Sequence, residues 1–398
     1  MGLVDGILSI EDFALENQRV LLRLDLDVAD PARERARLRA VRASIEHAQR
    51  AGARVVLAAH RGTPEGKPND SLSMEPIGAA LSELLGCDIY LPDDCVGDAA
   101  RKVIQDLRPG QVCLLENLDF YVEERDNDET FARKLASFAD IYVNDSLRDS
   151  RTARASVDQL ARSLHKRCMG LRLKSELTGV ARVSEAPEKP FVLVVGGANA
   201  AAGLDLIQKL LDRVSLVLVG GTPGNTLAAA RGAKLQKSSV DDNQLARARA
   251  LFNQARDRSV ELVVPIDFEV AENARAKSAL SASLSSIGEG LMALDVGPNT
   301  LNLFSNKVTN AKTVLWFGPL GAAKNPVFAK KTLDFANALA QSSAFTVTVA
   351  DDTAEAIGHA DESVLCKFGL VSTAGRAALE LIEGRKLPGI EALRGGAT

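Results

Sequence analysis

The stretch FVLVVGGANAAAGLDLIQKLL, residues 191–211, contains a strand, a turn and the start of a helix in one short run. Its first five residues are apolar or β-branched, Gly196 and Gly197 follow, and a helix-forming segment comes next. Free backbone N–H groups and the helix dipole make such a turn a natural cradle for phosphate. Such cradles usually also contain a lysine, but this loop offers Asn199, three alanines and Gly203. The stretch therefore predicts an α/β fold with a phosphate loop that lacks its cation.

Apolar runs alternate with amphipathic segments along nearly the whole chain around this stretch. Continuous β-branched runs between helices are typical of a parallel sheet that is covered on both faces. Two such series predict two doubly wound, Rossmann-like α/β domains joined by a helix. The predicted strands are 20–28, 54–59, 88–91, 111–116 and 140–144 in the first series and 191–195, 215–219, 261–265, 313–317 and 345–350 in the second.

Residues 172–189 mark the boundary between these two domains. A connecting helix is predicted over LRLKSELTGVARV, and the polar, proline-containing SEAPEKP follows it. The first domain is therefore expected to occupy residues 1–171, and the second is expected to begin at residue 190.

Composition and charge exclude several classes of protein. The 398 residues suffice for two domains, and 46% hydrophobic with 25% charged residues is ordinary for a globular protein. A net charge of −4 argues against nucleic acid or an anionic membrane as a partner. No apolar run approaches the ~20 residues of a membrane span, and the acidic start MGLVDGILSIEDFALE lacks the features of a signal peptide. We therefore expect a cytoplasmic protein.

The five cysteines are scattered singly, without a C-x-x-C pair or a histidine at metal-ligand spacing. Isolated cysteines in such a chain are most often buried free thiols. That is the expectation for Cys87, Cys95, Cys113, Cys168 and Cys366.

The ends of the predicted strands provide the candidates for a site, because ligands of open α/β sheets bind beyond the carboxyl ends of the strands. In the first domain these positions carry polar side chains: Asp25, Asp27, His60, Glu116, Asn117, Asn144 and Asp145. In the second they carry mainly turns, at 196–197, 220–221, 295–297, 318–321 and 351–352. Two half-sites that face a cleft predict two ligands that meet there, with domain closure excluding water.

Several segments occur in one order and spacing: LLRLDLDVAD, AAHRGTPEGK, LLENLDFYVEE, YVNDSLRDSRTARAS, VVGGANAAAGL, LVGGTPGNT, LDVGPNT, VLWFGPLGAA and LVSTAGRAALELIEGRKLPGIEAL. Together they resemble the phosphoglycerate kinase family from near the N-terminus to about Leu393. The resemblance implies a first domain for 3-phosphoglycerate or 1,3-bisphosphoglycerate and a second domain, ending at residue 380, for Mg–ADP or Mg–ATP. It also implies a hinge, a monomer, and a segment at 381–398 that returns to the first domain. The family reaction is reversible phosphoryl transfer between 1,3-bisphosphoglycerate and ADP in glycolysis.

On the acid side, the resemblance implies a substrate-binding role for several residues that match the family pattern and for others that replace it. Asp25, His60 and the catalytic arginine, Arg37, are retained, while Asp27 replaces an asparagine. Other family arginines and histidines are replaced: arginine by Thr63, Asp119 and Thr152, and histidine by Arg151 and Arg154.

On the nucleotide side, Asn199 and Gly203 stand where the family has two lysines, one of which contacts the transferred phosphate. Lys324 replaces the glutamate that binds the ribose hydroxyls, and Phe317 replaces an asparagine. The metal-binding position is kept as Asp352. The other nucleotide-binding positions implied by the resemblance are Gly196, Gly197, Ala198, Gly220, Gly221, Pro319 and Thr353.

Two glycine-rich loops of the family are altered as well. Val349, Ala350 and Asp351 replace three consecutive glycines, and Arg376 replaces a glycine of the last loop. A backbone can approach a phosphate only where no Cβ intervenes. These replacements are therefore expected to close the approach to phosphate.

Phosphoryl transfer depends mainly on positioning and on positive charge around the transferred group. A cationic contact there is worth on the order of 10³–10⁵ in rate, and this chain lacks several, while Asp27 and Asp119 add negative charge. The sequence therefore predicts a family member whose phosphotransferase activity is severely weakened or lost.

Other interpretations stay open. An active kinase, or an acyl-phosphate kinase of changed substrate, would use substitute cations such as Arg148, Arg151 and Arg154, and Lys324 would meet an anion. A non-catalytic paralogue would bind a phosphorylated metabolite or a nucleotide, or would be regulatory.

The retained residues also have structural interpretations. Asp25 would cap a neighbouring helix or pair with Arg23 or Arg37, and Arg37 would belong to a solvated, arginine-rich helix face. His60 would be an ordinary hydrogen-bonded histidine, and Asp352 would be a helix N-cap. The glycine pairs would be kept for turn geometry alone.

Overall fold

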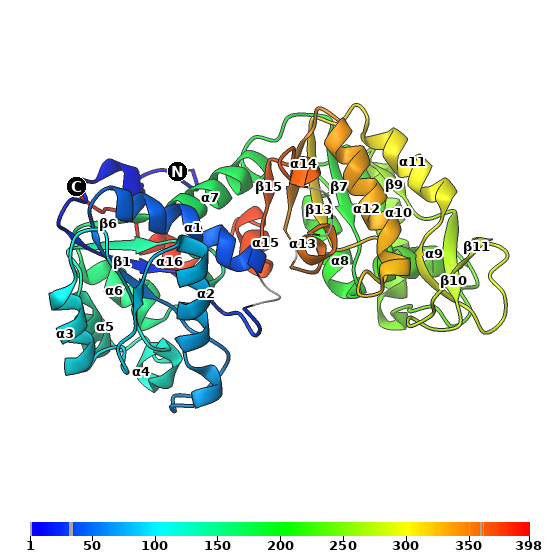
Figure 1. Ribbon diagram of the computed structural model, residues 1–398. Coiled ribbons are helices and arrows are strands. Elements are labelled where there is room, and N and C mark those ends of the chain that lie inside the picture. The colour runs from blue at the N-terminus through cyan, green and yellow to red at the C-terminus, as the bar shows by residue number, and fades with distance from the viewer. Residues whose placement is uncertain (1, 32–34, 350, 359, 361) are drawn as a thin grey trace. The chain divides into compact units, whose positions relative to one another are not determined.

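The structure is a computed structural model that describes residues 2–31, 35–349, 351–358, 360 and 362–398. It divides into two compact units, one formed by Met1–Ala181 with Gly384–Thr398 and the other by Arg182–Glu383. Each unit contains a parallel β-sheet with helices, so the predicted fold class is confirmed (Figure 1). Among the described residues, no helix has both the length and the apolar character needed to cross a membrane.

The first unit is built on a parallel sheet in which neighbouring strands come from distant parts of the sequence. β1 pairs with β2 on one side, Val20 opposite Val55, and with β5 on the other, Val20 opposite Ile141. Since the central strands are buried on both faces, their apolar runs are continuous. In the order of the sheet, the described strands are β3 (Ile89–Tyr90), β4 (Val112–Leu114), β2 (Arg54–Ala58), β1 (Arg19–Arg23), β5 (Ile141–Asn144) and β6 (Arg167–Met169).

Helix α1 (Arg35–Arg50) covers one face of this sheet because its apolar residues recur at helical spacing. Leu38, Val41 and Ile45 lie in the same buried core cluster as the strand residues. Burying each such side chain contributes roughly 1.5–3 kcal/mol. The other helices of this unit are α2 (Glu75–Leu85), α3 (Asp98–Asp106), α4 (Val122–Arg125), α5 (Glu129–Ala136), α6 (Leu160–Ser163), α7 (Leu171–Ser184), which continues into the second unit, and α16 (Pro388–Glu391).

The last residues of the chain belong to the first unit. Helix α16, red in Figure 1, packs against the 3-10 turn Asp149–Arg151. The Arg394 guanidinium donates to the carbonyl oxygens of Gly2, Leu3 and Asp5. These contacts join the two ends of the chain within one unit.

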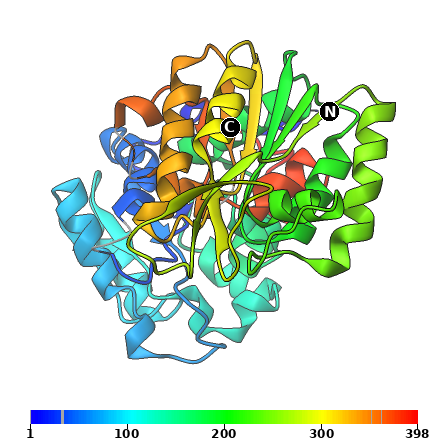
Figure 2. The same ribbon diagram turned by 90° about the vertical axis from the view of Figure 1, so that its right-hand side faces the viewer.

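The second unit has a parallel sheet of the same kind. Helices α11 and α12 lie on one side of its strands and α8–α10 on the other (Figure 2). In sheet order the described strands are β15 (Leu370–Val371), β14 (Phe345–Thr348), β13 (Thr313–Phe317), β7 (Phe191–Val195), β8 (Leu216–Val219) and β9 (Glu261–Val263). Its described helices are α8 (Ala200–Leu210), α9 (Gly221–Ala230), α10 (Leu245–Asp257), α11 (Pro298–Val308), α12 (Pro326–Gln341), α13 (Asp351–Ile357), α14 (Glu362–Leu365) and α15 (Arg376–Ile382).

The core of this unit is centred on the tryptophan of β13. Trp316 meets Phe335 of α12 edge to face, with ring centroids 5.2 Å apart, and Phe304 of α11 meets Phe335 in the same way. Such pairs add roughly 0.5–1.5 kcal/mol to the burial of the rings.

The structure also contains strands that the sequence pattern does not predict. A three-stranded antiparallel sheet is formed by β11 (Leu280–Ser283), β10 (Asp267–Ala271) and β12 (Met292–Val296). The short edge strands β6 and β15 are also additional. Of the free cysteines, Cys366 is exposed and Cys87 half-buried, so the expected burial is wrong for these two and confirmed for the others.

Candidate functional site

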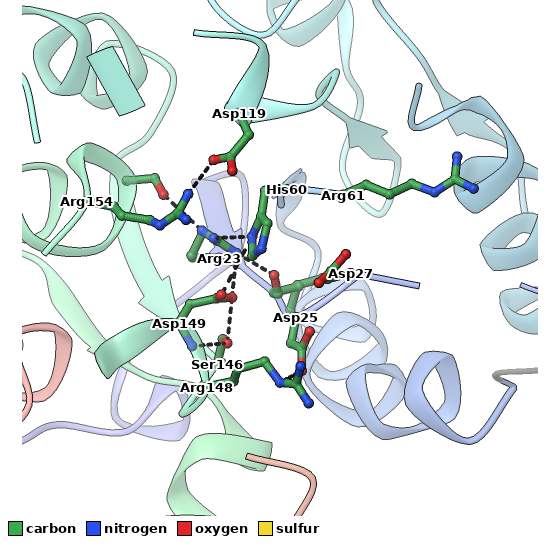
Figure 3. Close-up of polar contacts among 12 residues, drawn as sticks. Arg23, Asp25, Asp27, His60, Arg61, Asp119, Ser146, Arg148, Asp149 and Arg154 are labelled. Carbon is green, nitrogen blue, oxygen red and sulfur yellow. Dashed lines mark hydrogen bonds and ion pairs between the residues drawn. The ribbon is translucent and has the colours of Figure 1, made fainter. Parts of the chain in front are cut away.

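Arg23, the last residue of β1, is fully buried and organises the strand ends of the first unit (Figure 3). Its Nη1 donates to Asp149 Oδ2 at 2.9 Å and to the Leu24 carbonyl, and its Nε donates to Ser156 Oγ at 2.9 Å. Its Nη2 lies 3.1 Å from His60 Nδ1. A guanidinium can only donate, so His60 Nδ1 accepts this bond. The sequence-predicted His60 is therefore held by the protein's own buried arginine.

Asp149 neutralises Arg23 inside this network. Burial alone would raise the pKa of Asp149, but the Arg23 charge, the nearby His60 and the Ser146 hydroxyl lower it to about 2. The carboxylate is thus ionised at neutral pH. The positive charge of Arg23 is therefore balanced by Asp149 inside the core.

Asp119 and Arg154 form an ion pair (Figure 3). Asp119 is almost completely buried, whereas the Arg154 side chain is 22% exposed. Both are positions at which the resemblance implies a replacement, of an arginine by Asp119 and of a histidine by Arg154. The two side chains pair with each other, so Arg154 is directed at a protein carboxylate.

Asp27 and Arg37 lie together beside the loop that follows β2. The Asp27 carboxylate accepts from the Gly62 backbone N–H at 2.8 Å, and its carbonyl accepts from Arg37 Nη1 at 2.5 Å. Gly62 has φ +63°, a conformation that side chains rarely adopt. Asp27 therefore holds a glycine turn, and Arg37 is attached to the same residue.

Arg61 follows His60 in sequence but takes no part in this cluster. Its guanidinium donates to four backbone carbonyls, those of Val28, Ala29, Ser71 and Ser73, at 2.9–3.3 Å. It extends away from Arg23 and His60 in Figure 3. Its bonds tie the chain after β1 to the segment before α2.

Asp25 is fully buried, and neither of its carboxylate oxygens accepts a hydrogen bond from the described part of the chain. Arg148 Nε lies 3.6 Å and Arg172 Nη2 3.8 Å from Oδ2. Arg23, one of the two partners expected for Asp25, is instead bonded to Asp149. That expectation is wrong because the guanidinium turns along the sheet toward His60.

Three other candidates of the first unit lie at the surface, whereas Asn117, Asn144 and Asp145 are buried. Thr63, Arg151 and Thr152 are exposed. The structure therefore brings Asp25, Asp27, His60 and Asp119 together with Arg37 near the strand ends. The side chains of Thr63, Arg151 and Thr152 instead face solvent.

In the second unit, the glycine turns pack closely against one another. The Gly196 and Gly197 amides donate to the carbonyls of Phe317 and Pro319, both at 2.7 Å, and the Gly221 amide donates to the Leu320 carbonyl at 2.9 Å. A Cβ on Gly221 would lie 2.5 Å from the Gly197 carbonyl oxygen. The turns contact each other so closely that a side chain at these glycines would not fit. The N–H groups of these glycines donate to backbone carbonyls.

The two positions of the family lysines are occupied differently. Asn199 is the N-cap of α8, with its side-chain oxygen accepting from the Ala202 amide at 3.0 Å. A Cβ on Gly203 would lie 2.7 Å from Pro223 Cγ and 2.9 Å from Val195 Cγ1. The space for the stem of a side chain at position 203 is therefore filled by a proline ring and a strand valine.

Asp352 and Thr353 lie in the first turn of α13. Thr353 is buried and accepts from the Gly318 amide at 2.8 Å, so it supports a turn. Asp352 is the second residue of the helix and not its N-cap, and a Cβ on Gly197 would lie 3.4 Å from its Oδ2. Mg²⁺ in phosphotransferases is held by one or two carboxylates together with substrate phosphates.

The described residues contain no group of three His, Cys, Asp or Glu side chains that could hold a metal ion. Asp352 is the residue of this turn for which the resemblance implies a role in binding Mg²⁺ together with nucleotide phosphates.

The other nucleotide-side positions differ in their exposure, and Pro319 is buried. Lys324 is exposed, Phe317 is half-buried, and Arg376 is exposed with its Nε 3.2 Å from Glu380 Oε1, one turn further along α15. Val349 is buried, whereas Ala350 and the side chain of Asp351 lie outside the described residues.

Beside the turns, the second unit contains a cavity of about 200 Å³. Burial raises the pKa of Asp295, the acid in its wall. The lining residues are Gly197, Ala198, Gly221, Thr222, Asn225, Ser239, Phe268, Ala274, Met292, Ala293, Leu294, Asp295, Val296, Leu320, Gly321 and Ala322.

Several of these residues are not predictable from the sequence. Pro223 is in the family-like segment LVGGTPGNT, but its contact with Gly203 joins two turns that are separate in sequence. Arg172 lies on α7 and reaches Asp25 only in the folded chain. No local pattern signals either contact.

Comparison with known proteins agrees with this architecture. The sequence model of the phosphoglycerate kinase family matches residues 10–385. The chain is 38% identical over 394 residues to a phosphoglycerate kinase of Anaeromyxobacter sp. (strain Fw109-5), covering 97% of this chain and 99% of the relative.

Two solved structures are also similar. The phosphoglycerate kinase of Coxiella burnetii has 31% identity and a TM-score of 0.83 over 97% of this chain and 98% of its own. That of Pyrococcus horikoshii OT3 has 27% identity and a TM-score of 0.86 over 98% and 99%. The chain therefore belongs to the phosphoglycerate kinase family.

Proposed function

We propose that this family member has lost most of the phosphoryl transfer between 1,3-bisphosphoglycerate and ADP. The observation that carries the proposal is at position 203, where the family has a lysine and this chain has a glycine packed against Pro223 and Val195. With Asn199 capping α8, neither position offers a cation to a phosphate. We also propose that the protein is cytoplasmic and monomeric.

The nucleotide half would contribute little to the chemistry. One cation at the transferring group is worth on the order of 10³–10⁵ in rate. The amides of Gly196 and Gly197, which would otherwise contact phosphate oxygens, donate to backbone carbonyls.

The acid half is also weakened as an anion site. Arg154 is paired with Asp119, and Arg23 with Asp149. A phosphorylated acid would have to compete with these carboxylates for each guanidinium, and displacing one would leave a buried carboxylate without its partner. Such an uncompensated buried charge costs roughly 3–5 kcal/mol.

One observation favours a second candidate, an active kinase of changed substrate. Arg151 is exposed, and the Arg148 side chain is 27% exposed. Together with Arg37 these arginines would serve as substitute cations for an acid other than 3-phosphoglycerate.

A coupled assay of ATP formation from 1,3-bisphosphoglycerate and ADP tests the proposal. A family enzyme such as that of Coxiella burnetii, assayed in parallel, is the control. We expect turnover at least about 10³-fold below it. Turnover within tenfold of the control would contradict the proposal, and turnover restricted to another carboxylic acid would support the second candidate.

A further inference from the structure

Three of the large hydrophobic side chains that are exposed in the described part of the chain belong to two adjoining segments of the first unit. Tyr90, the last residue of β3, and Leu91 after it are each 39% exposed, and Val122, the first residue of α4, is 50% exposed. The Tyr121 hydroxyl donates to Asp94 Oδ1 at 2.9 Å, which joins the start of α4 to the loop after β3. We call Tyr90, Leu91 and Val122 the β3–α4 surface.

The fold holds the side chains of this surface in place. β3 is an edge strand of its sheet and pairs with β4, Tyr90 opposite Cys113. The Tyr90 hydroxyl accepts from Gln111 Nε2 at 2.7 Å, and the Tyr121 ring lies 5.2 Å from that of Phe131 in α5. Side chains that are ordered before binding lose little entropy when a partner docks. An exposed tyrosine with a fixed hydroxyl is therefore suited to anchor an interface.

The two segments that carry this surface are acidic. Within residues 88–98 and 121–126 one cation is exposed, Arg125 of α4, and five acids are exposed. This excess of four negative charges is as large as the net charge of the whole chain. The five exposed acids are Asp88, Asp93, Asp98, Glu123 and Asp126.

An apolar surface on acidic segments fits a partner that is itself basic and partly apolar. Apolar side chains supply the contact, while opposite charges steer the encounter and disfavour wrong partners. A second copy of this chain does not fit, because it would bring the same acids against one another. Nucleic acids and anionic membranes are disfavoured by the same repulsion.

We propose that the β3–α4 surface docks a basic, partly apolar segment of another protein. The proposal does not depend on the proposed function, because the surface contains none of the candidate site residues. It gives the first unit a protein partner in addition to any small ligand at its strand ends.

A model peptide tests the kind of partner. Fluorescence anisotropy of the full chain is measured with a labelled amphipathic peptide of leucine and lysine, about 14 residues long, and with the same peptide carrying glutamate in place of lysine. We expect the lysine peptide to bind at least tenfold more tightly. At about 500 mM NaCl, which screens exposed charges, we expect weaker but measurable binding through the apolar contact. No binding of the lysine peptide at about 0.1 mM, or binding that vanishes with salt, would overturn the proposal.

Reversing two charges tests the location. Asp93→Lys with Glu123→Lys removes the whole excess of negative charge from the two segments, and Glu272→Lys with Glu289→Lys is the matched control at exposed acids of the second unit. We expect at least a tenfold loss of affinity for the lysine peptide in the first pair and less than a twofold change in the second. Equal losses would show that binding follows the net charge of the chain, and would overturn the site.

Removing apolar side chains tests the contact itself. Tyr90→Ser with Val122→Ser is compared with Ile266→Ser and Leu280→Ser, whose native side chains are 49% and 67% exposed in the second unit. We expect at least a fivefold loss of affinity in the first pair and less than a twofold change in the second. Equal affinity in the two pairs would overturn the apolar contact. The charge-reversal pairs keep Tyr90 and Val122, so they test the same surface should Tyr90→Ser disturb β3.

Analytical ultracentrifugation of the chain without peptide tests whether a second copy is the occupant. We expect the mass of a monomer for the native chain and for Asp93→Lys with Glu123→Lys. A native dimer that this pair of substitutions dissociates would identify a second copy as the occupant and overturn the proposal.

Discussion

Position 203, where the resemblance implies a lysine, is a glycine enclosed by its neighbours. The space that a side chain at this position would need is taken by Pro223 from the next glycine turn and by Val195 from β7. We therefore expect a lysine placed at position 203 to be poorly accommodated, because the stem of its side chain would meet a proline ring that cannot rotate away.

The variant Gly203→Lys is expected to lower the free energy of unfolding by about 1–3 kcal/mol through overpacking, although glycine in a helix is itself unfavourable by about 1 kcal/mol. Gly203→Lys with Pro223→Ala is expected to recover most of this loss. Urea denaturation measures both, with Ala201→Lys on the half-exposed side of α8 as the control. A single variant as stable as the control would show that the site is not filled.

The Asp119–Arg154 pair makes a second prediction for single residues. Arg154→Ala leaves the buried Asp119 carboxylate without its ion-pair partner, and we expect a loss of roughly 2–4 kcal/mol in unfolding free energy, less than a fully buried pair because Arg154 is 22% exposed. Adding Asp119→Asn should recover much of it. A double-mutant cycle gives the coupling energy between the two side chains. A coupling energy near zero would show that the ion pair does not stabilise the protein.

At the scale of elements, α7 is anchored to the first unit by groups from two other elements. The Leu171 amide donates to Ser44 Oγ of α1, and the Leu173 amide donates to Asp145 Oδ1 after β5, both at 3.0 Å. These bonds satisfy amides of the first turn that lack helical partners. The cap on the helix leading into the second unit is thus a buried, non-local carboxylate.

Burial of Asp145 predicts a pH dependence. Burial raises its pKa from 3.8 to about 6, against opposing hydrogen bonds from Ser44 and Leu173. The folded state therefore binds a proton more readily than the unfolded state, and the stability contributed by this group is full below pH ~3.8 and lost as pH rises through ~6. The difference of about two pKa units corresponds to roughly 3 kcal/mol.

Asp145→Asn removes this titration and keeps an acceptor for Leu173. We expect the variant to gain up to about 3 kcal/mol over the native chain at pH 8 and clearly less at pH 4.5. Urea unfolding at the two pH values is the measurement. An equal difference in unfolding free energy between the variant and the native chain at both pH values would mean that Asp145 is not the titrating group.

The elements also show how far sequence alone predicts this structure. Apolar runs such as 191–195 and 313–317 coincide with β7 and β13, because strands buried on both faces must be continuously apolar. β11 is missed because LSAS has small polar residues at an exposed edge. The sequence predicts which positions belong to the candidate site, but it does not predict which side chains contact one another. The pairing of Asp119 with Arg154, for example, depends on a fold that joins distant residues.

At the scale of the whole molecule, the first unit is completed by the end of the chain. Leu387, Ile390 and Leu393 are buried, and the Arg394 guanidinium donates to carbonyls of the first five residues. Burial of each large apolar side chain contributes roughly 1.5–3 kcal/mol. We therefore expect this segment to contribute to the stability of the first unit.

Deleting residues 385–398 is expected to destabilise the first unit and to spare the second. Trp316, the one tryptophan of the chain, lies in the second unit and reports on its unfolding by fluorescence, while far-ultraviolet circular dichroism reports on both. We expect an earlier transition by circular dichroism with an unchanged fluorescence midpoint. A fluorescence midpoint that moves by the same amount would contradict this assignment.

The proposed loss of phosphoryl transfer is tested most directly in a single turnover, which separates the chemical step from binding. The purified chain, in excess over ATP labelled in its γ-phosphate, is mixed with millimolar 3-phosphoglycerate and Mg²⁺, and labelled 1,3-bisphosphoglycerate is followed by rapid quench. Enzyme turnover is ordinarily ~1–10³ s⁻¹, and missing cations predict a transfer rate constant below ~10⁻² s⁻¹. A rate constant above ~1 s⁻¹ would contradict the loss of activity.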